Sequence, residues 1–268
     1  MRIVIILLCV VITGCDFGKS PPVESTNNQV ASSDPITVKL PIIPSIPHER
    51  PSVLVDAIWL KNNLDSPDLR ILELGQSRED FGQSHIPGAQ YLDWLSDITA
   101  PELPEHYMVL SQQAMEALMS RVGISHDSSV IIYDTLTNRL STRMFWTLRY
   151  YRHNDIRILD GGMQAWKRAG FDLVSDITEV AESEYKIDQI NHEYLADKEY
   201  IQSRLKNDQF SLVDGRPEDQ YTGKIPGKVF HSGTEHQRKG HIMGAHNVPW
   251  SLNFNEDGDS FFCYVTLK

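Results

Sequence analysis

The chain has little cysteine, fewer basic than acidic residues and no long apolar run. Three of its 268 residues are cysteines (Cys9, Cys15 and Cys263), too few for a scaffold held together by disulfides. Twenty-five basic residues oppose 36 acidic ones, and the net charge of -11 disfavours nucleic acid and anionic membrane surfaces as partners. The remaining balance, 41% apolar and 23% charged residues, is typical of a globular protein, and the length predicts two domains.

The apolar residues at the amino terminus form only a short run, Ile3 to Ile12, which follows Arg2. This run is too short to span a bilayer and is typical of the core of a secretory signal peptide. The residues Ile12-Thr13-Gly14-Cys15 resemble a bacterial lipobox, so we expect a signal peptide over residues 1–15 and a lipid on Cys15. The alternative is an ordinary signal peptide in which Cys15 is incidental.

Residues 16–50 are rich in serine, asparagine and proline, and we expect a disordered tether there. The protein would then be exported and held by its lipid on the periplasmic face of a bacterial membrane. Asp16, directly after the modified cysteine, resembles the signal that retains such proteins at the inner membrane. With Cys9 removed and Cys15 lipidated, Cys263 would be the one free thiol, so no disulfide could form within the mature chain.

Strands and helices alternate along the rest of the chain, which predicts an α/β fold with a parallel sheet covered by helices on both faces. The predicted elements are a helix after a cap at Ser52, a strand at Arg70–Leu74, an extended segment at Gln90–Trp94, a helix from Ser111 to Gly123, a strand from Val130, a helix from about Ser141 to Tyr151, a strand at Ile156–Leu159, a helix with Ala165 and Trp166, a helix with Leu195 and Ile201, and a strand at Phe210–Asp214.

A polar loop lies between the strand from Val130 and the helix from Ser141. Such a junction aims several backbone N–H groups at one point, and the helix dipole adds partial positive charge, so the loop is a natural cradle for an anion or a thiolate. The residue at its first position decides the chemistry, and that residue is Asp134. We favour a capping role, in which the Asp134 carboxylate accepts hydrogen bonds from local N–H groups. The other loop residues are Thr135, Leu136, Thr137, Asn138 and Arg139.

The segment Ile86–Trp94 recurs as Ile242–Trp250, at an offset of 156 residues. An internal repeat is the economical explanation. We therefore expect a first domain over residues 51–173 and a partial second copy over residues 190–268, with an insertion between Tyr221 and His236.

Four motifs together resemble the tandem rhodanese family, the thiosulfate and 3-mercaptopyruvate sulfurtransferases. They are SHIPGAQYLDW (Ser84–Trp94), GHIMGAHNVPW (Gly240–Trp250), VIIYD (Val130–Asp134) and LDGGMQAW (Leu159–Trp166). The resemblance implies a duplicated α/β domain whose amino-terminal copy commonly lacks the nucleophile. It also implies transfer of a sulfane sulfur from a donor such as thiosulfate or 3-mercaptopyruvate to a thiophilic acceptor, without a cofactor.

The reaction of this family needs a cysteine at the first position of the loop, because a thiolate carries the sulfur. Asp134 cannot hold a persulfide, so the first copy resembles the inactive one. The equivalent position of the second copy would be 290, beyond Lys268, and we expect the 268-residue chain to be catalytically incomplete. Cys263 aligns with Tyr107, well before the loop, and is interpreted as a free thiol without a catalytic role.

Other candidate site residues are basic. Arg139 and Arg143 could hold an anionic donor at a cleft between domains, and the alternative is a solvated helix face. Four histidines recur every five residues, a spacing that does not keep to one helix face, so no metal site is predicted. They are His231, His236, His241 and His246.

Two other functions are alternatives to sulfur transfer. The first is a non-enzymatic binding or scaffold module of rhodanese type, tethered to the membrane. The second is a related phosphatase, whose loop needs a cysteine, five further residues and then an arginine. Asp134 and Leu140 occupy those two positions, so the phosphatase hypothesis fails twice.

Overall fold

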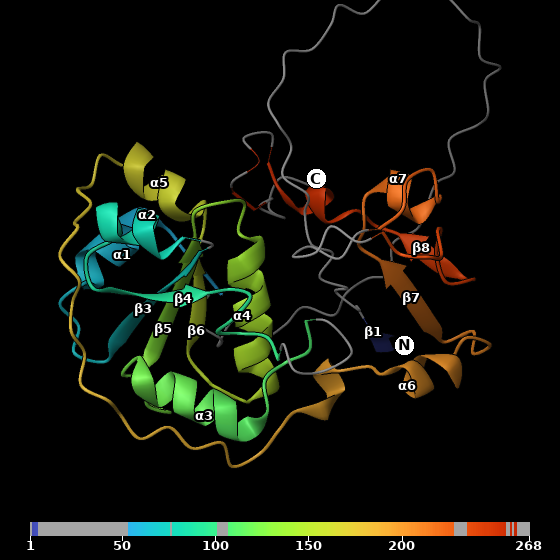
Figure 1. Cartoon of the computed structure of the whole chain (residues 1–268), viewed down its shortest axis with the longest axis horizontal. Helices are drawn as coiled ribbons and strands as arrows, with labels where there is room; N and C mark the ends of the chain where they lie inside the picture. The colour runs from blue at the N-terminus through green and yellow to red at the C-terminus, as the bar shows by residue number, and fades with distance from the viewer. Residues whose placement is uncertain are drawn as a thin grey trace, which may run out of the picture.

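The computed structural model describes residues 2–4, 53–75, 77–100, 107–227, 235–255, 258 and 260–261. The expected lipidation site Cys15, the tether at 16–50 and Cys263 lie outside these residues. Figure 1 shows two groups of elements, which we call the first half (residues 53–191) and the second half (residues 192–261). No helix among the described residues is long and apolar enough to cross a membrane.

A five-stranded parallel sheet in the order β2-β6-β5-β3-β4 forms the centre of the first half (Figure 1). Its elements are β2 (Leu54–Val55), α1 (Ala57–Asn63), β3 (Leu69–Gly75), α2 (Arg78–Gln83), β4 (Ala89–Asp93), α3 (Gln112–Arg121), β5 (Ser129–Asp134), α4 (Arg139–Tyr150), β6 (Ile156–Leu159) and α5 (Gly162–Arg168). This confirms the predicted α/β fold.

Helices cover both faces of this sheet. Apolar residues of α3 and α4 form one core with one face, and those of α1, α2 and α5 form a second core with the other. Within β5, Val130 and Ile132 belong to the first core, whereas Ile131 and Tyr133 belong to the second. Successive side chains of a strand point to opposite faces, so a strand buried on both faces is apolar at nearly every position.

The starts of two helices differ from the prediction. The cap of α1 is Asp56, whose Oδ1 accepts a hydrogen bond from the Trp59 N–H at 2.7 Å, and the predicted cap Ser52 lies outside the described residues. Helix α4 begins at Arg139, two residues before Ser141, because a distant side chain caps its first turn. The predicted cap Ser111 is correct, since its Oγ accepts from the Ala114 N–H at 3.3 Å.

A long segment without helix or strand follows α5 and runs past α3 to the second half (Figure 1). It packs on the first half: Tyr185 and Ile187 belong to the core beside α3. The Asn191 N–H donates to the Tyr150 carbonyl at 2.7 Å. Residues 174–189, which the predicted domains left unassigned, are thus part of the first half, and we call them the strap.

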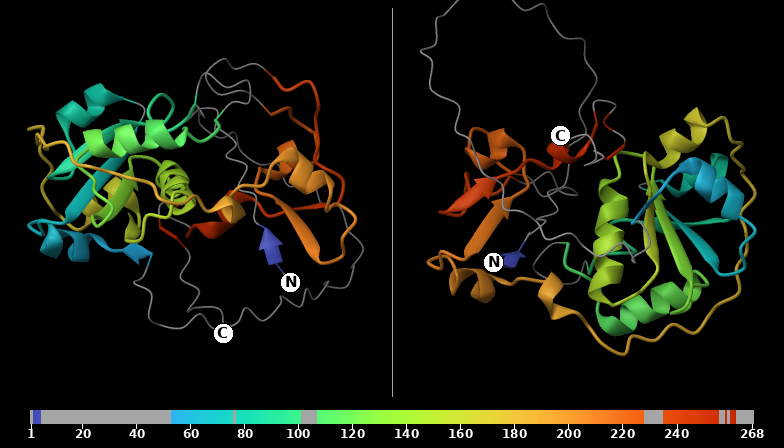
Figure 2. Two further views of the ribbon diagram at one scale, coloured as in Figure 1. Left: turned by 90° about the horizontal axis from the view of Figure 1, so that it is seen from below. Right: turned by 180° about the vertical axis from the view of Figure 1, so that it is seen from behind.

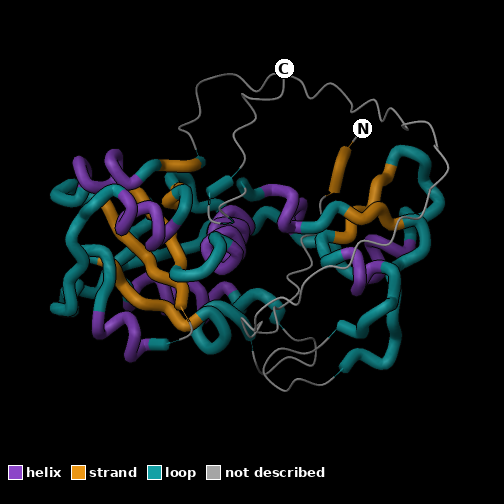
Figure 3. The backbone as a smooth tube through the Cα atoms, turned by 90° about the horizontal axis from the view of Figure 1, so that it is seen from above, coloured by secondary structure: helices purple, strands orange, loops and turns teal. Residues whose placement is uncertain are grey.

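The second half is mostly loop (Figure 3). Its elements are η1 (His192–Tyr194), α6 (Lys198–Gln202), β7 (Phe210–Asp214), α7 (Glu218–Tyr221), β8 (Ala245–Asn247) and η2 (Trp250–Asn253). The strand β1 (Arg2–Val4) pairs with one edge of β7 and β8 with the other, both in parallel (Figure 2). The single helix predicted around Leu195 and Ile201 is wrong, since Leu195 lies between η1 and α6.

One turn structure occurs in both halves. The Ala89 N–H donates to the Ile86 carbonyl at 3.1 Å, and the Ala245 N–H donates to the Ile242 carbonyl at 2.9 Å. The burial of the two turns differs, since Ile86 is 0% exposed and Ile242 is 50% exposed. The halves therefore share local backbone structure at this turn but differ in how much of it is covered.

Candidate functional site

The loop after β5 is closed around the Asp134 carboxylate. Oδ1 accepts hydrogen bonds from the N–H groups of Leu136 at 2.9 Å and Asn138 at 3.0 Å. Oδ2 accepts from those of Leu140 at 2.9 Å and Ser141 at 3.0 Å. Because Asp134 is 1% exposed, solvent does not compete for these four donors. The predicted capping role of Asp134 is confirmed, and the cradle is filled by the chain itself.

Backbone geometry around the loop makes this closure possible. Asn138 has a φ of 57°, in the left-handed region that asparagine tolerates, and its carbonyl accepts from the Ser141 hydroxyl at 2.8 Å. Gly162, at the start of α5, has a φ of +50°, and a Cβ there would lie 2.7 Å from the Asp134 carbonyl oxygen. The glycine pair in the LDGGMQAW motif therefore lets α5 approach the loop closely.

The electrostatics of the loop suit an anion that belongs to the protein. Burial raises the pKa of Asp134 overall, and the four backbone hydrogen bonds, Ser141 first, offset part of this rise by stabilising the carboxylate. Helix α4 also starts at this point, and its dipole favours negative charge. A carboxylate in this position can accept hydrogen bonds but cannot take up a sulfane sulfur. None of the loop residues from Thr135 to Arg139 offers a thiol in its place.

Arg139 and Arg143 are both half-buried, so a solvated helix face does not describe them. The Arg143 Nη2 donates to the Tyr107 carbonyl at 2.6 Å, and its guanidinium lies 4.9 Å from the centre of the Trp146 ring. The Arg139 guanidinium lies 4.4 Å from the centre of the Trp250 ring. Burial lowers the pKa of Arg139, and the nearby charge of Asp134 opposes this shift. The two predicted arginines therefore lie near the loop but in different environments.

A buried acid beneath the loop was missed from the sequence. Glu73 is 2% exposed and accepts a short hydrogen bond from the Tyr133 hydroxyl, which in turn accepts from the Ile86 N–H at 3.1 Å. Burial raises the pKa of Glu73 to about 7, against the opposing effect of the Tyr133 hydrogen bond. The available signal was a single acidic residue inside the apolar strand Leu69–Gly75.

The acid at the corresponding place in the second half has a different partner. The strand pairing places Glu73 opposite Tyr91 and Asp214 opposite Asn247, and the two partners, Tyr91 and Asn247, are 156 residues apart. Burial alone would raise the pKa of Asp214, but its hydrogen bonds and ion pair with Arg216 lower it overall. No three acidic, histidine or cysteine side chains among the described residues come together as a metal site.

Comparison with known proteins identifies the family. Residues 56–169 match the family pattern described as the rhodanese-like domain. The sulfur carrier protein TtuD of Thermus thermophilus is 30% identical over 214 residues, which cover 79% of this chain and 74% of that protein. A protein of Mycobacterium leprae provisionally named thiosulfate sulfurtransferase is 32% identical over 209 residues, covering 78% of this chain and 74% of that one.

The fold agrees with these matches. The crystal structure of SseA, a 3-mercaptopyruvate sulfotransferase from Escherichia coli, superposes with a TM-score of 0.69 at 24% identity and covers 80% of each chain. The superposition extends beyond residues 56–169 and supports the same overall fold. On the strength of the sequence relatives and this architecture, the chain belongs to the rhodanese family.

Proposed function

We propose that the protein serves sulfur transfer of the rhodanese type, with thiosulfate or 3-mercaptopyruvate as donor and a thiophilic acceptor. We also propose that residues 1–268 by themselves bind the donor but do not turn it over. The relatives named sulfur carrier protein and thiosulfate sulfurtransferase support the reaction class. The single observation that carries the second part is the Asp134 carboxylate, which accepts four backbone hydrogen bonds inside the loop.

The chemistry explains why this observation decides the matter. In rhodanese-type transfer a cysteine thiolate attacks the sulfane sulfur of thiosulfate, the S–S bond breaks, and sulfite leaves with the bonding electron pair. The enzyme persulfide then gives its outer sulfur to the acceptor. Asp134 has no atom that can form this persulfide, and its carboxylate occupies the N–H groups that would stabilise one.

The direct test measures thiocyanate formed from thiosulfate and cyanide by the purified chain. We expect no rate above that of a Cys263→Ser variant, because Cys263 lies outside the motif that makes the cradle. Thiocyanate formation that depends on Cys263 would contradict the proposal, since it would show a working nucleophile at that position.

The second candidate is a non-enzymatic binding or scaffold module of rhodanese type. The closed loop supports this module as strongly as it supports the first proposal, because the hydrogen bonds to Asp134 stabilise the fold without any reaction. The two candidates differ in one respect: the scaffold hypothesis predicts no affinity for thiosulfate or 3-mercaptopyruvate. A calorimetric titration of each donor therefore separates them.

We propose, in addition, that the protein is exported and held at the periplasmic face of a bacterial inner membrane by a lipid on Cys15. The support is the lipobox-like segment Ile12–Cys15, the apolar run before it and Asp16 after it.

A further inference from the structure

The strap covers a buried histidine of the first half. His153 lies directly after α4, where Arg152, with a φ of 58°, ends the helix, and the His153 N–H donates to the Leu148 carbonyl at 3.0 Å. His153 and Tyr185 of the strap are each 1% exposed. Their rings are stacked, with centroids 5.8 Å apart and an angle of 19° between the planes. The strap therefore shields one face of the imidazole from solvent.

The two ring nitrogens of His153 have different partners. Nε2 lies 2.9 Å from the Ser128 carbonyl oxygen, which can only accept, so Nε2 carries the ring proton. Nδ1 lies 3.1 Å from the Tyr185 hydroxyl. Burial raises the pKa of Tyr185, so the hydroxyl keeps its hydrogen and donates to the Nδ1 lone pair. The docked strap thus fits a neutral imidazole.

Protonation of His153 would reverse the role of Nδ1. An imidazolium has an N–H group at both nitrogens, so Nδ1 would donate and the Tyr185 hydroxyl would have to accept. The hydrogen of that hydroxyl would then need another acceptor in a place that solvent does not reach. A buried donor without an acceptor and a buried charge without a paired anion are both costly. Docking of the strap and protonation of His153 therefore oppose each other.

The charged groups around His153 do not remove this cost. Burial is the largest cause of the lowered pKa of His153. The ring centroid of His126 lies 6.0 Å from that of His153, and His126 and Arg149 both disfavour a positive charge there. Asp155 favours one, but its carboxylate already accepts from the Arg157 Nε at 3.0 Å. The surroundings of the docked ring therefore keep it neutral.

We propose that His153 and Tyr185 form a pH-sensitive latch, which holds the strap on the first half at neutral pH and releases it in mild acid as His153 takes up a proton. The strap leads from the first half to the second (Figure 1), so the latch controls how firmly this connection is held. The latch does not depend on the proposed sulfur chemistry.

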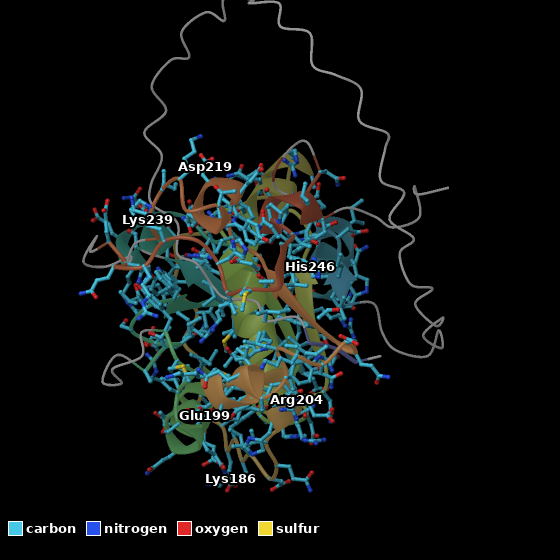
Figure 4. All side chains as sticks on the ribbon, turned by 90° about the vertical axis from the view of Figure 1, so that its right-hand side faces the viewer. Lys186, Glu199, Arg204, Asp219, Lys239 and His246 are labelled. Carbon is cyan, nitrogen blue, oxygen red and sulfur yellow. The ribbon has the colours of Figure 1, made fainter. Side chains whose placement is uncertain are left out.

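The neighbouring anchors of the strap respond to a different pH range. The Tyr185 N–H donates to Ser120 Oγ at 3.1 Å, and the Ile187 N–H donates to Glu116 Oε1 at 2.9 Å. Lys186, labelled in Figure 4, lies between them and is exposed. Hydrogen bonds, that of Ile187 first, lower the pKa of Glu116 below its ordinary value of 4.5. Glu116 therefore stays ionised, and holds Ile187, over the range in which a histidine takes up its proton.

Hydrogen exchange of the purified chain, read by mass spectrometry of its peptides at about pH 8 and about pH 5, tests the latch. Labelling times are scaled to the intrinsic exchange rate at each pH. Because the pKa of His153 is lower with the strap docked, docking is strongest above the ordinary histidine pKa and weakens as the pH falls below it. Opening of residues 183–189 should therefore increase by up to about tenfold for each pH unit below about 6.5, while β5 keeps its protection.

Three variants locate the titrating group. His153→Gln has a donor and an acceptor but takes up no proton, so its strap should open equally at both pH values. His126→Gln removes the neighbouring histidine and should keep the response. Tyr185→Phe keeps the ring and loses the hydroxyl, so its strap should open more than that of the wild-type chain at about pH 8 and gain less towards about pH 5. This last variant keeps the test decisive if His153→Gln folds poorly.

The outcomes that contradict the latch are equally specific. No increase in the wild-type chain, or the same increase in His153→Gln, overturns it. Loss of the increase in His126→Gln also overturns it, because the titration would then belong to His126. An increase that β5 shares would be unfolding of the whole first half and would overturn a local release. Glu73 cannot imitate the latch, because its raised pKa stabilises the fold as the pH falls.

Discussion

The Asp134 carboxylate accepts the hydrogen bonds of loop N–H groups that could otherwise bind an anion. Four backbone N–H groups converge on its two oxygens in a place that solvent does not reach. A buried N–H group without a partner costs about 1–3 kcal/mol. Asp134 therefore has a structural role in this loop, whose residues 134–139 include no thiol.

Asp134→Ala should lower the free energy of unfolding by about 2–4 kcal/mol, because the N–H groups lose their acceptor and water replaces only part of it. Urea denaturation at neutral pH measures the change. Thr135→Ala, at an exposed position in the same loop, is the matched control and should have little effect. Equal midpoints for Asp134→Ala and the wild-type chain would show that the carboxylate does not hold the loop.

Glu73 predicts a pH dependence of stability. Its pKa is about 7 in the folded chain, above the ordinary value of 4.5, so between these values the folded state holds a proton that the unfolded state has lost. Its contribution to stability is full below about pH 4.5 and is lost as the pH rises through about 7. Urea midpoints over this range should fall with pH more steeply for the wild-type chain than for Glu73→Gln. Parallel curves would mean that Glu73 ionises normally in the folded protein.

At the scale of elements, the sequence predicted strands better than helix starts. The bounds of β6 and β7 agree with the prediction, because each is a short, mostly apolar segment between polar and turn residues. The start of α4 was not predicted because its capping residue, Asp134, lies five residues before the helix. Its side chain accepts from the Leu140 N–H only once the loop between them has folded. Glu73 was missed because its burial depends on the central place of β3 between β4 and β5.

The strap was not predicted because it has no periodic pattern. It is held by separate anchors instead: Tyr185 and Ile187 enter the core, and the His153 Nδ1 lies 3.1 Å from the Tyr185 hydroxyl. His85 joins its start through a backbone bridge to Val174. These contacts connect residues far apart in the sequence, so no local pattern could have shown them.

Limited proteolysis should trim the second half and leave a fragment that ends near residue 190, because the strap belongs to the first core. Tyr185→Ala should move this boundary back towards residue 173, since it removes the largest anchor of the strap. Resistance of residues 192–261 equal to that of the first half, in a monomer, would contradict this account of the second half.

The two halves differ as wholes in how well they are buried. Leu92 is 0% exposed, whereas Val248, at the matching position in the second half, is 44% exposed. Ile86 is likewise buried and its counterpart Ile242 exposed, although the turns that follow them have the same hydrogen bond. This contrast supports the interpretation of the second half as a partial copy, which remains a prediction.

The proposed anchoring of the protein to a membrane depends on a lipid attached to Cys15. Radiolabelled palmitate should be incorporated into the wild-type chain expressed in a Gram-negative bacterium, and Cys15→Ala should remain unlabelled, because the lipobox-like segment Ile12–Cys15 directs the modification to that thiol. Cys263→Ser is the control for labelling of an unrelated cysteine. Equal labelling of wild type and Cys15→Ala would rule out the anchor.

The most direct test of the central claim is intact-mass spectrometry of the non-lipidated chain after incubation with thiosulfate and removal of the excess. The account predicts an unchanged mass, because the cradle that would stabilise a persulfide is filled by the Asp134 carboxylate and its loop has no thiol. A stoichiometric gain of one sulfur atom that cyanide removes would contradict it, since the chain would then carry sulfane sulfur without a cysteine in the loop.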